Sequence, residues 1–225
     1  MNVLKAGLDV GSTTAKFAVI DDGGILVFSR YERHNADIPN IVSQFVRELK
    51  AELGDREISL AFTGSAGMGA AEKYSFPFRQ EVMATADFVR AKYPDISTVI
   101  DIGGEDAKIL YLNSGGVPDL RMNGNCAGGT GAFIDQMATL MDVPVEDLET
   151  LSRAHERTYA IASRCGVFAK SDIQPLLNQG ARKEDIARSI FEAVANQTIA
   201  GLAQGRPIAG NVVYLGGPLT FFSQL

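Results

Sequence analysis

The sequence predicts an α/β fold made of two duplicated lobes, and three observations indicate it. Strand-like apolar runs alternate with helix-like runs along the 225 residues. The octapeptide DVGSTTAK of residues 9–16 is repeated without a gap as DIGGEDAK at residues 101–108, with Asp, Gly, Ala and Lys in the same places. The offset of 92 residues is too long for a solenoid period but suits a second lobe. We expect lobes at residues 1–94 and 95–225.

The composition excludes several classes of protein. A formal charge of -6 and a pI near 5.0 argue against nucleic acid as the main partner. No apolar run has the length needed to cross a bilayer, so no membrane role is expected. The N-terminus shows no signal-peptide pattern, which makes the cytoplasm the expected compartment. In a reducing compartment two cysteines are more often ligands or free thiols than a disulfide.

The first lobe begins with a glycine-containing hairpin that could hold phosphate. Strands are expected at residues 3–9, 15–21 and 25–30, with turns at 10–14 and 22–24. Backbone N–H groups of a turn of small residues can surround a phosphate. Lys16 would add positive charge, and Asp9 could hold Mg²⁺ through water. An ordinary hairpin with a solvated turn is the alternative for a single copy.

The rest of the first lobe is expected to alternate helix and strand. We predict a helix at 38–53 that stops at Gly54, a strand at 58–62 and a helix at 80–92. The glycine-rich loop at 64–69 lacks the Gly-Lys-Ser/Thr ending of a Walker A motif, so we interpret it as a crossover or hinge. His34 and His155 have no partner pattern and are expected at the surface.

The second lobe repeats the hairpin and adds more helix. We predict strands at 109–112, 118–122 and 211–215, helices at 145–152, 168–179 and 182–204, and a turn at 216–219. The helix at 168–179 should kink or restart at Pro175. Two acidic hairpins facing each other across a shared cleft would be a site for Mg²⁺ and a polyphosphate.

The two cysteines lie in similar places. Cys126 is in a glycine-rich turn ahead of a helix whose N-cap is expected to be Thr130, and Cys165 precedes another helical run. Free N–H groups and the helix dipole at such a start favour a thiolate, which can act as a nucleophile or a metal ligand. Two small buried thiols are the alternative, but glycine and polar neighbours argue against it.

These motifs resemble those of a known superfamily. The two octapeptides and Gly216-Gly217 are similar to the phosphate and adenosine motifs of actin, hexokinase and the heat-shock chaperone ATPases. The segments RMNGNCAGGTGAFIDQMA (121–138) and IASRCGVFAKS (161–171) resemble the activator ATPases of 2-hydroxyacyl-CoA dehydratases, a family that includes ATPase subunits of benzoyl-CoA reductase. The resemblance covers essentially the whole chain. It implies a two-lobed actin/hexokinase-like, ribonuclease H-like ATPase fold with duplicated mixed β-sheet lobes.

The segment YERHNAD (31–37) and Glu105 resemble most closely the long, multidomain branch of this family, in which the ATPase module is N-terminal. Family members continue past the Gly-Gly turn with further strand and helix. We therefore expect the chain to be a fragment that lacks part of the adenine pocket.

The resemblance implies a homodimer that holds one [4Fe-4S] cluster by Cys126 and Cys165 of each subunit. The stoichiometry agrees, since a cubane needs four thiolates and a two-fold dimer of this chain supplies four. ATP binding and hydrolysis would then drive a low-potential electron from a ferredoxin- or flavodoxin-type donor into a dehydratase-like acceptor protein.

The resemblance also implies roles for individual residues around ATP or ADP. Asp9 and Asp101 would position Mg²⁺, and Glu105 or Asp106 would orient or deprotonate the attacking water. Gly216 and Gly217 would approach the adenosine. The expected phosphate-binding residues are Gly11, Ser12, Thr13, Thr14, Lys16, Gly103 and Gly104.

Other functions stay open on the same fold. The chain could be a small-molecule kinase with incidental thiols, which would phosphorylate an acceptor and contain no iron. It could also be a regulatory module that binds ATP without turnover, or a zinc-bridged dimer. The turn around Cys126 discriminates best, because a kinase has no need of it.

Overall fold

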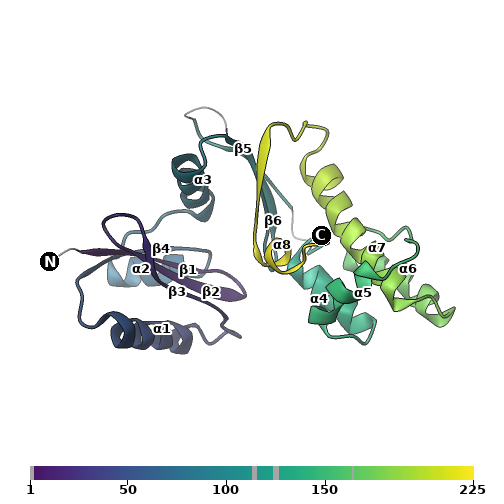
Figure 1. The fold of residues 1–225 in the computed structure, drawn as a ribbon, viewed down its shortest axis with the longest axis horizontal. Helices are drawn as coiled ribbons and strands as arrows, with labels where there is room; N and C mark the ends of the chain where they lie inside the picture. Colours follow the sequence, from purple (N-terminus) through teal and green to yellow (C-terminus); the bar gives the residue numbers. More distant parts are fainter. Residues whose placement is uncertain (1–2, 113–115, 124–126, 164) are drawn as a thin grey trace. The chain divides into compact units, whose positions relative to one another are not determined.

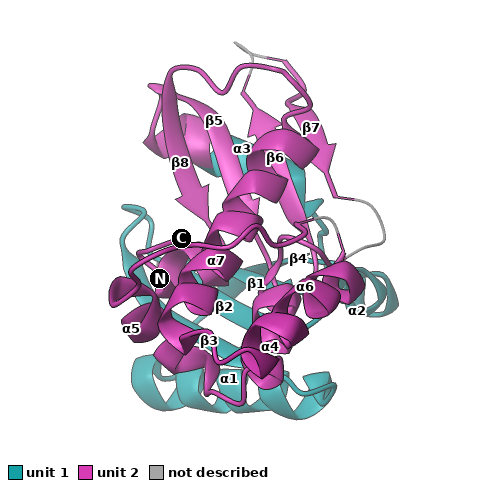
Figure 2. Cartoon of the chain, turned by 90° about the vertical axis from the view of Figure 1, so that its right-hand side faces the viewer, with its two compact units in different colours: residues 1–88 teal, residues 89–225 magenta. Residues whose placement is uncertain are grey.

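The computed structural model describes residues 3–112, 116–123, 127–163 and 165–225. The chain divides into two compact units, Met1–Phe88 and Val89–Leu225, shown in two colours in Figure 2. The division falls within helix α3, Glu81–Lys92. Each unit has its own four-stranded sheet and its own hydrophobic core.

Unit 1 is a mixed sheet covered on its buried face by two helices. Its strands are β1 (Leu4–Val10), β2 (Thr14–Ile20), β3 (Leu26–Arg33) and β4 (Ile58–Thr63), in the order β3-β2-β1-β4. Strand β4 runs parallel to β1, while the other neighbours are antiparallel. Helix α1 (Ile38–Leu53) packs on β2 and β3, and α2 (Gly67–Tyr74) packs on β4 and β1 (Figure 1).

Strand alternation in unit 1 places polar residues on the face opposite the core. Leu4, Ala6, Leu8 and Val10 of β1 are buried in the core, so Asp9 points to the other face. The helix predicted at 38–53 is confirmed with both ends, Pro39 in its first turn and Gly54 at its C-cap with φ 70°.

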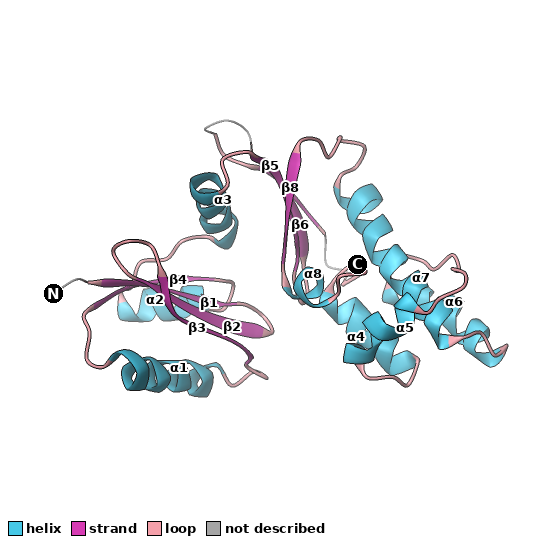
Figure 3. Ribbon diagram, in the orientation of Figure 1, coloured by secondary structure: helices cyan, strands magenta, loops and turns pink. Residues whose placement is uncertain are grey.

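Unit 2 repeats this sheet and adds a layer of helices. Its strands are β5 (Ile96–Ile102), β6 (Ala107–Tyr111), β7 (Asp119–Met122) and β8 (Asn211–Leu215), in the order β7-β6-β5-β8. Strand β8 is parallel to β5, and the other pairs are antiparallel. The helical segments, coloured in Figure 3, are α4 (Gly131–Leu140), η1 (Val145–Asp147), α5 (Leu148–Arg153), α6 (Gly166–Asn178), α7 (Lys183–Asn196), η2 (Gln197–Leu202) and α8 (Gly217–Phe221).

The two sheets have the same strand order and the same strand directions, so the predicted α/β fold with two duplicated mixed sheets is confirmed. Along the chain, only α1 lies between strands β3 and β4 of unit 1. In unit 2, the long helical segment from α4 to η2 lies between the corresponding strands β7 and β8. Among the described residues, no helix combines the length and the apolarity that a membrane span needs.

Four local expectations were wrong. Residues 217–219 of the turn predicted at 216–219 lie in helix α8, for which Gly216 is the N-cap. Residues 67–69 of the predicted glycine-rich loop lie in helix α2, which runs on to Tyr74. Of the kink or restart predicted at Pro175, the restart does not occur, since helix α6 continues through this proline to Asn178. The helix predicted at 182–204 changes to a π-helix at Gln197, where the Thr198 hydroxyl donates to the carbonyl of Val194 and competes with the helical pattern.

Candidate functional site

The hairpin between β1 and β2 holds an acidic and a basic side chain against each other. Asp9 and Lys16 are cross-strand partners, and Lys16 Nζ lies 2.8 Å from Asp9 Oδ2. The turn between them is closed by the amide of Gly11, which donates to the carbonyl of Thr14 at 3.0 Å. Ser12 at the tip is exposed. The predicted phosphate turn therefore exists as a tight hairpin with an ion pair at its base.

The ion pair keeps Lys16 charged. Burial alone would lower the pKa of Lys16, but the charge of Asp9 and its hydrogen bond outweigh burial and raise the pKa above its ordinary value of 10.5. The ammonium also lies 5.6 Å from the ring centroid of Tyr31. Lys16 is thus a permanent cation at neutral pH, as a phosphate-neutralising residue must be.

One carboxylate oxygen of Asp9 is unpaired among the described residues. Its Oδ2 is held by Lys16, whereas its Oδ1 is buried and has no hydrogen-bond partner within the described chain. A buried carboxylate oxygen is costly to leave unpaired. The unpaired Oδ1 fits the magnesium ion, or a water bound to it, that the resemblance implies at Asp9.

His34 supports the same turn from behind, contrary to the expectation that it is a surface residue. Its side chain is buried, and its Nδ1 accepts a hydrogen bond from the amide of Ala36 at 3.1 Å. The other ring nitrogen, Nε2, must then carry the proton, and it lies 3.1 Å from the carbonyl of Gly11. Asn35 and Ala36 both have positive φ, 46° and 64°, so this contact is built on strained backbone. His155 is exposed, as expected.

The hairpin between β5 and β6 has the same register as the first. Asp101 pairs with Lys108 across the strands, and the amide of Gly103 donates to the carbonyl of Asp106 at 2.8 Å to close the turn. On this hairpin the buried Lys108 lies 2.9 Å from a carboxylate oxygen of Asp106 in the turn. Glu105 is exposed at the tip.

The second turn is joined to the cysteine-bearing segment at both ends of that segment. Asn123 donates its amide to the carbonyl of Ala107 at 3.0 Å and accepts the amide of Ala107 on Oδ1 at 2.9 Å. At the far end, the amides of Gly131 and Ala132 donate to the carbonyls of Gly103 and Gly104 at 2.9 and 2.7 Å. Four hydrogen bonds therefore connect the turn at 103–107 to the segment at 123–132.

The start of helix α4 differs from the expectation in one respect. Thr130 is its N-cap, as predicted, but its hydroxyl donates to the carbonyl of Ala127 instead of capping an amide. The first two helical amides, expected to be free for the thiolate, are occupied by the carbonyls of the second turn. Cys126 itself lies outside the described residues.

Gly131 is the point where three elements meet. A Cβ at this position would lie 3.3 Å from the carbonyl oxygen of Gly103, 3.3 Å from Cγ of Pro218 and 3.4 Å from Cα of Gly104. These distances are tighter than ordinary contacts, so only glycine lets the elements approach without displacement. Pro218 lies in the first turn of helix α8, directly after Gly216 and Gly217, which the sequence places at the adenosine, and Gly216 has φ 96°.

Cys165 is the N-cap of helix α6 and is partly buried. The helix dipole at this position stabilises a thiolate, as the sequence predicts. Val167 and Phe168, in the first turn of α6, are 70% and 66% exposed, so an apolar surface adjoins the cysteine. Among the described residues, no group of three or more His, Cys, Asp and Glu forms a metal site.

Buried polar contacts to α7 hold the chain that leads to Cys165. Asp185 Oδ1 accepts the amides of Glu156 and Arg157 at 2.8 and 3.2 Å, and Ser189 Oγ accepts the amide of Tyr159 at 2.8 Å. The amide of Glu156 is the largest of the causes that hold the pKa of Asp185 below its ordinary value of 3.8.

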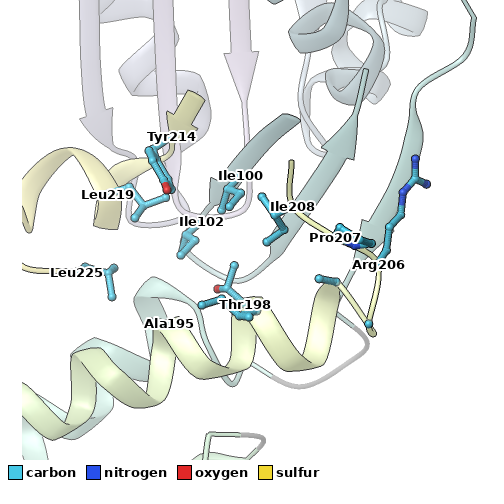
Figure 4. A pocket seen from close by; sticks show the side chains of 13 residues that line it. Ile100, Ile102, Ala195, Thr198, Arg206, Pro207, Ile208, Tyr214, Leu219 and Leu225 are labelled. Atoms are coloured by element: carbon cyan, nitrogen blue, oxygen red, sulfur yellow. The ribbon is translucent and has the colours of Figure 1, made fainter. Parts of the chain in front are cut away.

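A cavity of about 550 Å³ lies between strands β5 and β8 and the end of α7 (Figure 4). Its lining is mainly apolar, with Ile100, Ile102 and Leu219 among its residues. The guanidinium of Arg206 is engaged elsewhere, 3.9 Å from the ring centroid of Tyr111 and paired with Asp119. The cavity wall is therefore not built for phosphate.

Sequence reasoning missed four residues at these turns: His34, Gly131, Thr63 and Gly64. Thr63 is the register partner of Asp9 on β4, and a Cβ at Gly64 would come within 3.0 Å of Asp9 Oδ1. The signal for Gly64 was present, since it follows an apolar strand as Gly216 does. The 92-residue offset of the octapeptides does not align Gly64 with Gly216. The reason is the longer helical insertion that precedes β8, the strand of unit 2 that corresponds to β4.

Comparisons with known proteins agree with this geometry. The sequence model of the BadF/BadG/BcrA/BcrD ATPase family matches residues 6–221. The chain is 32% identical over 219 residues to the (R)-2-hydroxyglutaryl-CoA dehydratase activating ATPase of Acidaminococcus fermentans, covering 96% of this chain and 84% of that protein. It is 33% identical over 214 residues to the 2-hydroxyisocaproyl-CoA dehydratase activator of Clostridioides difficile, covering 94% and 79%.

Solved structures give the same result. The crystal structure of the A. fermentans (R)-2-hydroxyglutaryl-CoA dehydratase component A matches with a TM-score of 0.88 at 30% identity, over 99% of this chain and 86% of that one. The C. difficile 2-hydroxyisocaproyl-CoA dehydratase activator with bound ADPNP matches with a TM-score of 0.84 at 30% identity, over 100% and 82%. The chain therefore belongs to the BadF/BadG/BcrA/BcrD ATPase family.

Proposed function

We propose that this member of the BadF/BadG/BcrA/BcrD ATPase family is an ATP-hydrolysing activator that passes a low-potential electron to a 2-hydroxyacyl-CoA dehydratase or a related reductase. The observation that carries the proposal is the set of four hydrogen bonds between the turn at 103–107 and the segment at 123–132. They join a phosphate-type turn to the segment that contains Cys126, which a protein that only phosphorylates a small molecule would not need.

Nucleotide binding is assigned to the glycine turns of both units. Backbone amides and hydroxyls of residues 11–14 and the amides of Gly103 and Gly104 bind phosphate oxygens, and Lys16 neutralises their charge. Asp9 and Asp101 hold Mg²⁺, in part through water, and the ion supplies charge neutralisation of the polyphosphate. Gly216 and Gly217 approach the adenosine, where the positive φ of Gly216 keeps the backbone open.

Hydrolysis needs mainly positioning and electrostatic stabilisation in this arrangement. Glu105 and Asp106 lie in the turn of the second hairpin, so either carboxylate can orient or deprotonate a water near the terminal phosphate. Asp106 is paired with Lys108, whereas Glu105 is exposed at the tip of the turn.

Cys126 and Cys165 of two subunits are proposed to hold one [4Fe-4S] cluster across a two-fold axis. The cluster would supply one-electron transfer at low potential. Cys165 fits the role of ligand, since it is an N-cap thiol on a 13-residue helix. The exposed Val167 and Phe168 next to it suit the subunit contact that the shared ligand set requires.

The partners follow from the relatives. Their names identify activators of 2-hydroxyglutaryl-CoA, 2-hydroxyisocaproyl-CoA and lactoyl-CoA dehydratases. A protein of the dehydratase type is therefore the proposed electron acceptor here, and a ferredoxin or flavodoxin is the proposed donor. We place the protein in the cytoplasm, where such electron carriers operate.

Anaerobic purification with counting of iron and sulfide, followed by Mg-ATP hydrolysis assays, tests this function. We expect four iron and four sulfide per dimer and hydrolysis of Mg-ATP. Phosphorylation of an acceptor without iron would instead make the protein a kinase. Nucleotide binding without turnover, or zinc in place of iron, would make it a regulatory module. Each of these outcomes contradicts the proposal.

A further inference from the structure

A hydroxyl lies beside Asp9 at the end of the neighbouring strand. In the parallel pair of β1 and β4, Thr63 is the register partner of Asp9. The Oγ1 atom of Thr63 is buried and makes no hydrogen bond within the described chain, and the same is true of Asp9 Oδ1. Two unpaired buried oxygens therefore belong to register partners at the same end of the sheet.

The two oxygens require an explanation, because a buried hydroxyl without a partner costs free energy. They do not satisfy each other, although a hydroxyl can donate to a carboxylate. Lys16 occupies only Oδ2 of Asp9. A hard divalent cation, or a water bound to it, is the ligand that accepts electron pairs from a carboxylate and a hydroxyl together.

The residue after Thr63 keeps the space around these atoms open. Gly64 has φ 85°, and a Cβ there would come within 3.0 Å of both Asp9 Oδ1 and the carbonyl oxygen of Val10. Gly216 has the same relation to Asp101 Oδ1 and to the carbonyl oxygen of Ile102 in unit 2. The turn after β4 is thus the counterpart of the turn assigned to adenosine, and the glycine prevents a side chain from covering the carboxylate.

The hydroxyl itself is specific to unit 1. The register partner of Asp101 on β8 is Leu215, whose side chain has no oxygen. The sheet geometry that the two units share therefore does not by itself explain the hydroxyl at position 63. Its chemistry points to a ligand that only the first hairpin binds in this way.

We propose that Thr63 is a further cation-binding residue, whose hydroxyl acts with Asp9 Oδ1 to hold the divalent cation, directly or through one of its waters. This inference rests on the proposed function, since the nucleotide phosphates would complete the coordination. Mg²⁺ in proteins commonly keeps few protein ligands and takes the remainder from phosphate and water. The proposal also assigns Gly64, the first residue of the glycine-rich loop that the sequence favours as a hinge, to the nucleotide site.

The test compares Thr63→Val, which removes the hydroxyl at nearly constant shape, with Thr63→Ser, which keeps it. Thr139→Val is the matched control, because Thr139 is exposed and its hydroxyl bonds only to its own helix. Binding of Mn²⁺ in the presence of ADP is measured by electron paramagnetic resonance, and ADP binding in EDTA is measured separately. We expect Thr63→Val to weaken Mn²⁺ binding about tenfold, equivalent to about 1.4 kcal/mol. Thr63→Ser and the control should match the wild type.

Thermal unfolding separates this role from a structural one. Without cation, Thr63→Val should unfold at or above the wild-type temperature, because a methyl group replaces an unpaired buried hydroxyl. The stabilisation by added Mn²⁺ and ADP should shrink in this variant. A loss of stability without cation, together with unchanged Mn²⁺ affinity, would show that Thr63 is structural and would overturn the inference.

The outcomes also separate this inference from the proposed function. Wild-type ATP hydrolysis with equal Mn²⁺ affinity in Thr63→Val removes Thr63 from the site and leaves the ATPase intact. Mn²⁺ binding that depends on Thr63, without hydrolysis by the wild type, supports the cation site and contradicts the activator function. A wild type that binds no Mn²⁺ with ADP overturns both.

Discussion

The hairpins of the two units have the same backbone and different surroundings. Asp9 and Asp101 each face a lysine across the strands, each precede a turn closed by a glycine amide, and each lie beside a positive-φ glycine. In unit 1, however, the neighbouring strand offers the Thr63 hydroxyl, whereas in unit 2 it offers Leu215. The second turn instead hydrogen-bonds the segment at 123–132.

The difference shows how the two copies of a duplicated hairpin can divide the work of ligand binding and connection to the rest of the protein. Register and turn geometry are set by backbone hydrogen bonds, so they survive duplication while side chains change. Asp9 Oδ1 of the first hairpin and Thr63 Oγ1 of the neighbouring strand β4 are unpaired within the described chain and suit a cation. In the second hairpin, the carbonyls of Gly103 and Gly104 accept hydrogen bonds from the first amides of α4. Within the proposed function, the first hairpin is therefore the one suited to bind the cation, and the second is the one connected to the cysteine segment.

The largest effect is expected from Asp9→Asn compared with Asp101→Asn. Because Asp9 carries the unpaired oxygen, Asp9→Asn should lower kcat for Mg-ATP hydrolysis by on the order of 100-fold or more and leave the iron content unchanged. Asp101→Asn should cost about tenfold less than this. Steady-state hydrolysis measures both, and equal losses would contradict the proposed division of work.

Gly131→Val should break the connection between nucleotide and helix. The added side chain would separate α4 from Gly103 and Gly104, with a stability cost of about 1–3 kcal/mol. We expect Mg-ADP to slow amide hydrogen exchange at the start of α4 in the wild type but not in the variant.

The matched control for this experiment is Gly69→Val in α2, where a Cβ would meet no atom within 4 Å. It should retain the response of α4 to nucleotide. If Gly131→Val also retains the response while the helix stays folded, the junction does not transmit the state of the turn.

A smaller effect is expected at His34, which supports only the first turn. The side chain in His34→Gln cannot hydrogen-bond the carbonyl of Gly11 and the amide of Ala36 at the same time, as the ring does. KM for ATP should therefore rise about tenfold, equivalent to about 1.4 kcal/mol of binding free energy, with a smaller change in kcat. His155→Gln, at an exposed position, should leave both constants unchanged. An unchanged KM in His34→Gln would show that the turn holds its shape without the histidine.

The smallest effect concerns Asp185, which anchors the chain before Cys165 in unit 2. A carboxyl whose pKa is lowered in the folded state stabilises the protein above its ordinary pKa of 3.8, and this stabilisation is lost as pH falls through the lower folded pKa. Asp185→Asn should therefore lower the unfolding temperature near neutral pH, and its difference from the wild type should shrink below about pH 4. A difference that is independent of pH would indicate lost packing rather than lost charge.

Much of the fold was predictable because local chemistry specifies it. Strand β1, which contains Asp9, alternates buried residues with more exposed ones, and helix α1 begins after Asp37 with Pro39 in its first turn and ends at Gly54. The π-helix at Gln197 was not predictable, since its cause is a side chain that bonds to the backbone within an otherwise helical pattern.

The candidate site was only partly predictable for a similar reason. The sequence repeat identifies the two turns, but His34 reaches Gly11 across 23 residues of chain, and Thr63 reaches Asp9 only through strand pairing. A lone histidine or threonine carries no local sign of such a contact. The cysteine assignments depend on the family resemblance, and Cys126 lies outside the described residues.

The sequence by itself determined the duplicated α/β plan, the two acidic glycine turns and the cysteine segments, because each depends on residues that are close together along the chain. Only the tertiary structure decided which distant groups meet these turns: His34 behind the first, Thr63 and Gly64 beside Asp9, and Gly131 against the second. Strand pairing and helix packing bring these residues together, and such long-range contacts leave no periodic trace in a single sequence.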